Sequence, residues 1–188
     1  ALADGTVIDP LGGLPDLIAR RLRFVGDAEQ RIREDYLRIL RFFRFHAIYA
    51  DPEQGIDAEG LAACAANLDG IAALSRERVG SEVRKLLSAA NPAPALAAMA
   101  QSGVSAQILP AADPRALAPV EHLENGAAPD WQARLAVIGG EDPSTSLRLS
   151  KAETVSNVQI RDEIGTTTTP AALAWRYGAK VATATVLC

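Results

Sequence analysis

Hydrophobic residues recur at intervals of three and four positions over most of the chain, a spacing that predicts helices. Glycine or proline at Gly70, Pro92 and Gly103 separates several of the helical segments. We expect a mainly α protein. The segments that we expect to be helical are 28–50, 58–66, 71–74, 76–90, 92–103, 130–138, 145–164 and 171–187.

Two short segments near the start have the composition of β-strands instead. These are Thr6-Val7-Ile8-Asp9-Pro10 and Leu22-Arg23-Phe24-Val25, and a Gly12-Gly13 turn and a short helix lie between them. The paired glycines lack the longer spacing of phosphate-binding loops, which favours a simple bend. Because a lone strand is not stable, the first strand either pairs with a later segment or, as we favour, is the remnant of a sheet that lies mostly upstream.

The segment 31–49 places charged residues in an otherwise apolar helical pattern. At about 100° per residue, Glu34, Asp35, Arg38 and Arg41 fall within about a third of the helix circumference. Asp35 and Arg38 could simply form an i,i+3 ion pair on a solvated face. Two features favour a ligand site: Arg41 and Arg44 continue the three-residue step, and aromatic residues crowd the same turns. Arginines among aromatic rings suit a planar or phosphorylated ligand.

Composition supports the helical prediction, and the distribution of charge indicates which ligands the chain could attract. The chain has 36 alanines against 4 phenylalanines and 2 tryptophans, which is typical of closely packed helices. Its formal net charge is −4, yet residues 20–44 hold 8 arginines and only 4 acids, a local patch that attracts anions. For Trp131 and Trp175 the sequence favours core positions over base-stacking platforms.

Cysteine usage and hydropathy exclude some classes of protein. Cys64 and Cys188 are the only cysteines, so a disulfide framework is not expected. No apolar run reaches the ~18 residues that span a bilayer, so we expect a cytoplasmic protein with no membrane partner. The oligomeric state stays open.

An aspartate beside an arginine has a specific use in nucleotide recognition. Cytosine and adenine each present an amino donor next to a ring-nitrogen acceptor on the Watson–Crick edge. A carboxylate can accept from the amino group, and a guanidinium can donate to the ring nitrogen. Uracil and guanine present a carbonyl and a ring N–H there, so they mismatch such a pair. Asp35 and Arg38 could therefore select C and A.

Short motifs follow one another in a fixed order through the first half of the chain. They are Asp9, Gly12-Gly13, Asp16-Leu17, Leu22-Arg23, Gly26-Asp27, Glu34-Asp35-x-x-Arg38, Glu77-Arg78-x-x-x-Glu82 and Leu86-Leu87. In this order they resemble the bacterial class II tRNA nucleotidyltransferases (CCA-adding enzymes) and poly(A) polymerases. The resemblance thins in the second half to pieces such as Leu147-Arg148-Leu149-Ser150-Lys151.

The resemblance implies the domains and their activity. Residues 1–27 would be the C-terminal end of the nucleotidyltransferase head, which contributes the β-strand remnant. Residues 28–104 would be the helical neck that selects the base, and residues 105–188 the helical body, a possible tRNA-contacting region. The whole enzyme would add CCA or A to RNA 3′ ends without a template. An alternative is a non-catalytic helical module that binds RNA or protein.

The resemblance also implies roles for individual residues. Asp35 and Arg38 match the pair that selects CTP or ATP, and Arg41 matches a position near the incoming nucleotide. Asp9, Gly12, Gly13 and Asp16 match a flexible motif between head and neck. Glu34 belongs to the nucleotide-reading motif and supports the pair. A bracing motif of the neck matches Glu77, Arg78 and Glu82.

The catalytic carboxylates of the family have no counterpart in this sequence. In the family, an Asp-x-Asp strand upstream of the matched motifs holds Mg²⁺, which two-metal nucleotidyl transfer requires. Asp4 and Asp9 lack that spacing. We therefore expect this segment to bind no Mg²⁺ and to have no catalytic residue, and the 188-residue chain alone to be inactive. CCA addition and poly(A) addition remain undistinguished.

Overall fold

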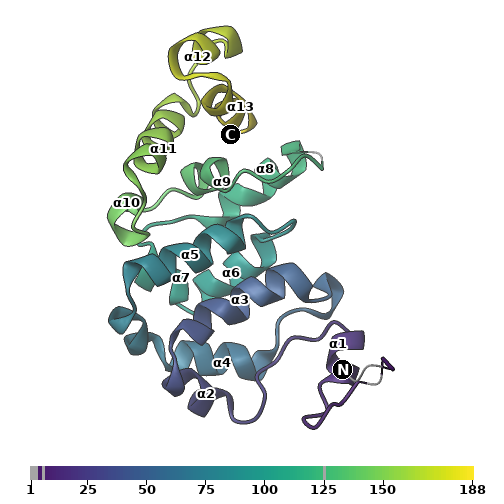
Figure 1. The fold of residues 1–188 in the computed structure, drawn as a ribbon. Coiled ribbons are helices and arrows are strands. Elements are labelled where there is room, and N and C mark those ends of the chain that lie inside the picture. Colours follow the sequence, from purple (N-terminus) through teal and green to yellow (C-terminus); the bar gives the residue numbers. More distant parts are fainter. Residues whose placement is uncertain (1–3, 6, 125) are drawn as a thin grey trace.

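The computed structural model describes residues 4–5, 7–124 and 126–188, and within these ranges the chain is helical with no β-sheet (Figure 1). Ala112 and Gly139 form an isolated antiparallel bridge. The α-helices are α1 (Leu14–Ile18), α2 (Ala28–Glu34), α3 (Leu37–Tyr49), α4 (Ala58–Ala66), α5 (Arg76–Leu87), α6 (Ala93–Gln101), α7 (Val104–Ile108), α8 (Leu117–Glu124), α9 (Trp131–Ile138), α10 (Pro143–Ser146), α11 (Lys151–Glu163), α12 (Pro170–Tyr177) and α13 (Ala179–Leu187). Short 3-10 helices cover Pro52–Gln54, Leu68–Ala73 and Pro114–Ala116.

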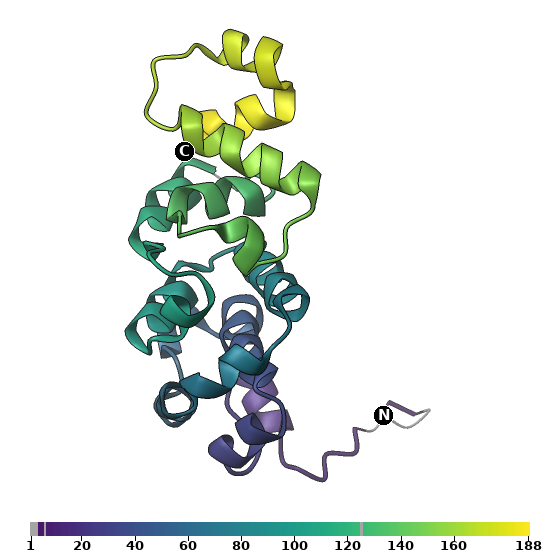
Figure 2. The same ribbon diagram turned by 90° about the vertical axis from the view of Figure 1, so that its left-hand side faces the viewer.

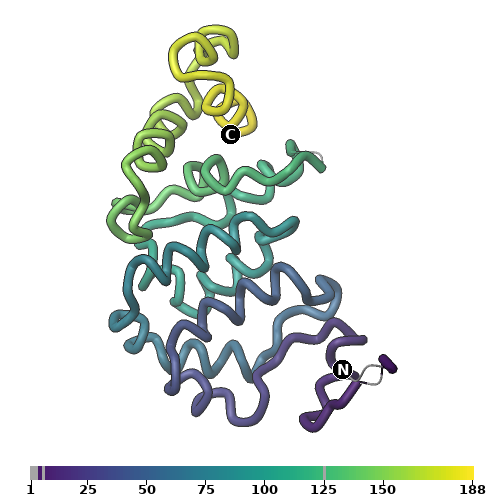
Figure 3. Tube along the Cα trace, in the orientation of Figure 1, coloured from purple at the N-terminus to yellow at the C-terminus, as the bar shows by residue number. Residues whose placement is uncertain are grey.

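The helices are stacked along one long axis. In Figure 1, α2 and α4 lie at one end, α3, α5 and α6 follow, then α8 and α9, and α11 to α13 form the other end. The tube in Figure 3 follows the same path without helix ribbons. Residues 7–27 are here called the N-terminal segment; the first part of this segment runs away from the stack, as Figure 2 shows, and its last part packs on the helices.

Two hydrophobic cores hold the stack together. The larger one extends from Ala28 to Leu147 and includes the fully buried Phe43 of α3 and Leu87 of α5. The smaller one joins α9 to α11 and α13. The larger core crosses residue 104 without a break, and the neck and body boundary at that residue stays a prediction.

The β-strand prediction for the N-terminal segment is wrong for the residues described. Val7 to Asp9 and residues 22–25 belong to no strand, and Thr6 lies outside the described residues. The β-strand composition of residues 22–25 has another explanation. Leu22 and Phe24 pack against the helical core while Arg23 and Val25 are exposed, so an extended segment lies on helices instead of pairing in a sheet.

The long helix predicted over 28–50 is also wrong, because the chain breaks at Asp35. This residue is extended, with φ −157° and ψ 104°, and follows the last residue of α2. Its carboxylate accepts a hydrogen bond from the Leu37 amide at 3.1 Å, and its carbonyl accepts one from the Arg38 amide at 2.9 Å. Aspartate commonly replaces a missing backbone partner in this way where a helix begins.

Two other predicted helices divide, and the remainder are confirmed within a few residues. Segment 145–164 breaks before Ser150, whose side chain and Glu153 form a capping box at the start of α11. Segment 171–187 breaks at Gly178, which has φ 85°. The expected cap at Ser75 is present at the start of α5. Trp175 is 90% exposed, so its predicted core position is wrong.

A buried ion pair ties the middle of the stack together. Arg134 of α9 is 1% exposed and donates to both carboxylate oxygens of Glu124 at the end of α8. The same guanidinium donates to the carbonyls of Leu87, at 2.7 Å, and Ala89, at 2.6 Å. It thereby satisfies carbonyls at the C-terminal end of α5, which have no partner within that helix.

The substitution Arg134→Ala should lower the free energy of unfolding by about 3–5 kcal/mol, because it leaves Glu124 buried without a partner. Arg115→Ala is the control: Arg115 also pairs with an aspartate, but its side chain is 91% exposed. It should leave the urea midpoint unchanged. Equal midpoints for the two variants would contradict this account.

Candidate functional site

A pocket of about 250 Å³ lies between residues 22–25 of the N-terminal segment and helices α2 and α3. We call it the arginine pocket. Four of its lining residues are arginines, three are phenylalanines and none is acidic. Such a lining suits a planar group that carries negative charge. The lining residues are Leu22, Arg23, Phe24, Val25, Arg31, Arg38, Arg41, Phe42 and Phe45.

An aromatic stack holds the N-terminal segment against α3. The rings of Phe24 and Phe42 are stacked with centroids 5.2 Å apart and an interplanar angle of 16°. Phe42 in turn meets the buried Phe43 edge-on, with centroids 5.4 Å apart. The wall that Phe24 contributes to the pocket is thus anchored in the hydrophobic core.

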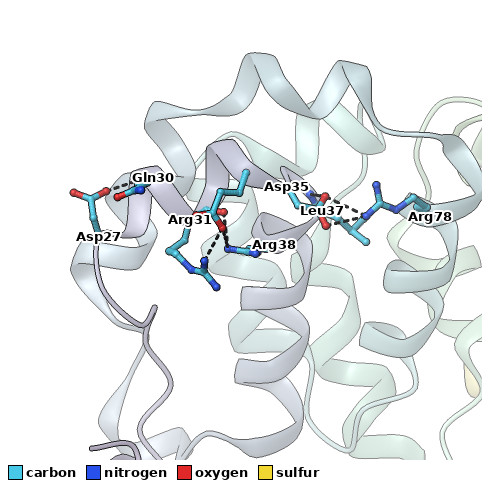
Figure 4. A network of polar contacts seen from close by, with 8 residues as sticks. Asp27, Gln30, Arg31, Asp35, Leu37, Arg38 and Arg78 are labelled. Atoms are coloured by element: carbon cyan, nitrogen blue, oxygen red, sulfur yellow. Dashed lines mark hydrogen bonds and ion pairs between the residues drawn. The ribbon is translucent and has the colours of Figure 1, made fainter. Parts of the chain in front are cut away.

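Arg38 enters this pocket from the first turn of α3 and is held there by Glu34. Its Nη1 donates to Glu34 Oε2 at 2.7 Å, and Arg31 Nη1 donates to the same oxygen at 2.6 Å (Figure 4). Desolvation raises the pKa of Glu34, whereas the hydrogen bonds from Arg38 and Arg31 lower it; the net shift is downward. Glu34 therefore stays ionised and orients two of the pocket arginines.

Asp35 faces a different partner. Both of its carboxylate oxygens accept from Arg78 Nη2 of α5, at 3.1 and 2.9 Å. Figure 4 shows this pair on one side of the α2–α3 junction and the Arg31 and Arg38 side chains on the other. The single charged wall expected from a continuous helix is therefore wrong: Asp35 pairs with Arg78 and Arg38 pairs with Glu34.

A second contact between α3 and α5 centres on Glu82. This glutamate is 5% exposed and accepts from Arg44 Nε at 2.5 Å. Arg41 Nε lies 4.0 Å and Lys85 Nζ 3.7 Å from its other oxygen. Together with Arg78 and Asp35, this cluster fixes α3 relative to α5 at two points one helical turn apart on α5.

Glu77, the remaining residue of the predicted bracing motif, reaches a different element. Its carboxylate lies 3.3 Å from Arg148, in the connection between α10 and α11, and both side chains are exposed. The same connection touches α5 at Gly80, where an added Cβ would lie 2.0 Å from the Leu147 carbonyl oxygen. Only glycine allows this approach.

The four predicted residues of the N-terminal segment cluster around α1. Asp9 accepts from the amides of Leu14, at 2.7 Å, and Gly13, at 2.8 Å, and these bonds lower its pKa. Gly12 has φ +65°, which glycine adopts without strain. Asp16 accepts from Arg23 Nε at 2.6 Å and so orients one lining residue of the pocket.

The sequence analysis missed Phe24, Arg23 and Arg31 as pocket residues. Arg31 precedes Arg38 by seven positions, and only the break between α2 and α3 brings the two to one carboxylate. Phe24 comes from a segment that packs back on α3, for which the sequence holds no signal. The aromatic residues around Arg41 were the one usable indication.

The described residues form neither a metal-ion cluster nor a membrane-spanning helix. No group of three or more His, Cys, Asp or Glu side chains there is arranged to hold a metal ion. The described residues therefore do not fit the Mg²⁺ site of nucleotidyl transfer. Among the helices in the described ranges, none is long and apolar enough to cross a membrane.

Comparison with known proteins identifies the relatives of this chain. Residues 55–115 match the family model described as a probable RNA- and SrmB-binding site of polymerase A. The human mitochondrial CCA tRNA nucleotidyltransferase 1 is 49% identical over 84 residues, which are 45% of this chain and 19% of that protein. The CCA-adding enzyme of Geobacillus stearothermophilus is 38% identical over 109 residues, 55% of this chain and 25% of the relative. The matched stretches are therefore similar to part of the CCA-adding enzymes and to a probable RNA-binding site of polymerase A.

Solved structures resemble nearly the whole chain in fold. The apo form of a CCA-adding enzyme covers 96% of this chain with a TM-score of 0.65 at 17% identity. A complex of a CCA-adding enzyme with CTP gives a TM-score of 0.66 at 16% identity. At these identities the likeness establishes a shared fold. The chain spans about half the length of these structures and about a quarter or less of the curated relatives.

The Glu82→Ala variant should lose about 2–4 kcal/mol of unfolding free energy, because Arg44 is left with a largely buried, unpaired charge. Glu77→Ala is a matched control on the same helix, since Glu77 also pairs with an arginine but is 65% exposed. It should unfold at the wild-type urea concentration. If both variants lost the same stability, burial at Glu82 would not be the cause.

Proposed function

We propose that the α2–α3 junction of this neck selects the base of CTP or ATP in an enzyme that extends RNA 3′ ends without a template. One observation carries the proposal. Arg38 lines an aromatic, acid-free pocket, while Asp35, three residues earlier, is fixed by a separate cation so that the two charged groups do not neutralise each other. The Asp35 carboxylate and the Arg38 guanidinium are thereby kept apart, although the two residues are only three positions apart in the chain.

Both groups retain hydrogen-bonding capacity. Asp35 Oδ2 accepts from Arg78 alone among the described residues, and a carboxylate oxygen can accept a second bond. Arg38 uses Nη1 for Glu34 and for the Arg31 carbonyl, which leaves donors on its other nitrogens. For one cytosine or adenine edge to take both sites, with its amino group on Asp35 and its ring nitrogen on Arg38, the Asp35 side chain must turn from Arg78 toward the pocket. Uracil and guanine would leave both mismatched.

The other pocket residues suit the remainder of the nucleotide. Phe24 and Phe45 offer apolar surface to a base, and the base can stack on such rings. The Arg41 side chain is 44% exposed and its Nε lies 4.0 Å from Glu82, so its guanidinium can also reach a phosphate. We propose that Arg41 lies beside the incoming triphosphate.

The chemical step belongs to the longer protein in this proposal. Mg²⁺ would be held there, outside the residues described, and this region would contribute base selection and positioning. CCA-adding relatives support nucleotide transfer to tRNA as the reaction. A tRNA or other RNA 3′ end is accordingly the proposed second substrate.

In the longer enzyme, Asp35→Asn should reduce the preference for C and A over U and G about tenfold or more. The amide replaces one carboxylate oxygen by a donor, and a hydrogen bond to a charged group contributes about 1.5–3 kcal/mol. Single-nucleotide extension of a tRNA 3′ end, measured with each triphosphate in turn, gives the four rates.

The substitution Arg78→Gln, measured in the same assay, distinguishes base selection by Asp35 from the structural support that Arg78 gives to Asp35. It weakens the hold on Asp35 but leaves the carboxylate in place. Rates should fall while the preference for C and A survives. A preference that Asp35→Asn leaves intact would remove Asp35 from its proposed role.

A further inference from the structure

A second cavity, of about 580 Å³, lies beside the arginine pocket where α3, α5 and the start of α9 meet. We call it the α5 groove. Three of its nine lining residues are arginine or lysine, one is tryptophan and none is acidic. The lining residues are Arg44, Ala47, Ile48, Arg84, Lys85, Ser88, Ala89, Ala90 and Trp131.

The α5 groove and the arginine pocket are neighbours along α3. Arg41 lines the pocket, and Arg44, one turn later, lines the groove. Glu82 contacts both of these arginines and also Lys85 of the groove. An RNA strand whose end reaches the arginine pocket would therefore meet a second cationic surface one helical turn along α3.

Lys85 is the cation in the groove that is available to a ligand. Arg44 is 12% exposed and bonded to Glu82, and Arg84 is bonded to Glu153 at 3.2 Å. Lys85 is 56% exposed, and its ammonium lies 3.7 Å from Glu82, beyond ordinary hydrogen-bond length. Its charge is thus only partly compensated.

Trp131 offers the flat apolar surface of the groove. It is half-buried at the start of α9, with Arg84 stacked over its ring at 5.4 Å from the centroid. The Nε atom of Arg84 is buried and has no hydrogen-bond partner among the described residues. The other end of the guanidinium is bonded to Glu153 and to the Arg148 carbonyl. Trp131 itself lines the groove and is partly exposed, and an aromatic ring can stack an unpaired base.

The groove does not repel phosphate, although it lies at the C-terminal end of α5. Free carbonyls at a helix C-terminus carry negative partial charge. Here Leu87 and Ala89 present their carbonyls to the buried Arg134. The Arg84 carbonyl accepts from the Ser88 hydroxyl at 2.8 Å. These bonds satisfy the carbonyls that would otherwise face an incoming anion.

We propose that the α5 groove binds one unpaired nucleotide of the RNA substrate, with a phosphate at Lys85 and the base against Trp131. The proposal rests on the proposed function, because it takes the RNA to be the chain that the enzyme extends. A cation beside an aromatic ring is the combination that binds single-stranded nucleic acid without reading its sequence. The groove would hold the substrate strand, and the arginine pocket the incoming nucleotide.

The test uses the 188-residue chain and a 5′-fluorescein-labelled, 12-nucleotide single-stranded RNA, followed by anisotropy from 50 to 200 mM KCl. Lys85→Gln should weaken binding about five-fold and reduce the slope of log K against log salt by about 0.7, the value for one lost phosphate contact. Arg115→Gln, an exposed arginine outside the groove, should change neither quantity.

Tryptophan fluorescence tests the base contact directly. With Trp175→Phe, Trp131 becomes the only tryptophan, and stacking of a base should quench its emission on addition of unlabelled RNA. Unchanged emission at saturating RNA, or equal binding by Lys85→Gln and Arg115→Gln, would overturn the proposal. Competition by poly-glutamate as strong as by RNA would overturn it in favour of an acidic protein partner.

The two proposals can fail separately. If Lys85→Gln weakens RNA binding while Asp35→Asn leaves the base preference unchanged, the groove stands and base selection by Asp35 is wrong. If Lys85→Gln has no effect while Asp35→Asn alters the preference, base selection stands and the groove is wrong.

Discussion

The pairing of α5 with the α2–α3 junction is the constraint on which the candidate site depends. Asp35 is extended between the two helices, and its carboxylate accepts hydrogen bonds from Arg78 of α5 and from the Leu37 amide at the start of α3. Tyr36, the next residue, packs over Gly70, where an added Cβ would lie 2.0 Å from the ring. The junction is therefore held by charge on one side and by close packing on the other.

Several arginines gather at this site, and each of them lies near a carboxylate. The arginine pocket has no acid in its lining, but acids just outside it hold three of its arginines: Asp16 holds Arg23, and Glu34 holds Arg31 and Arg38. Glu82 lies near Arg41 and binds Arg44. This arrangement keeps the guanidinium groups in place without filling the cavity. An anionic ligand then enters a site in which most of the repulsion is already offset.

Part of this organisation was predictable from the sequence. Helix periodicity located most helices, and the order of short motifs led to the family and to Asp35, Arg38 and Glu82. The break at Asp35 was not predictable from periodicity, because α2 and α3 keep apolar residues in step across it. The pairing of Asp35 with Arg78 spans 43 positions, and local patterns carry no information about such contacts.

The N-terminal segment is a second case in which local sequence did not reveal the packing partner. The composition of residues 22–25 predicted a strand, but composition does not show what an extended segment packs against. The structure packs this segment against α3 through Phe24 and Phe42. Sequence could not distinguish a helix from a sheet as the packing partner, and the pocket wall that follows from this packing was missed.

The central claim is that one base edge contacts both Asp35 and Arg38. A crystal structure of the longer enzyme with CTP bound tests it most directly. We predict the cytosine amino nitrogen within hydrogen-bond distance of an Asp35 carboxylate oxygen, and the ring N3 within the same distance of an Arg38 nitrogen. A cytosine that contacts neither side chain, with Asp35 still bonded only to Arg78, would contradict the account.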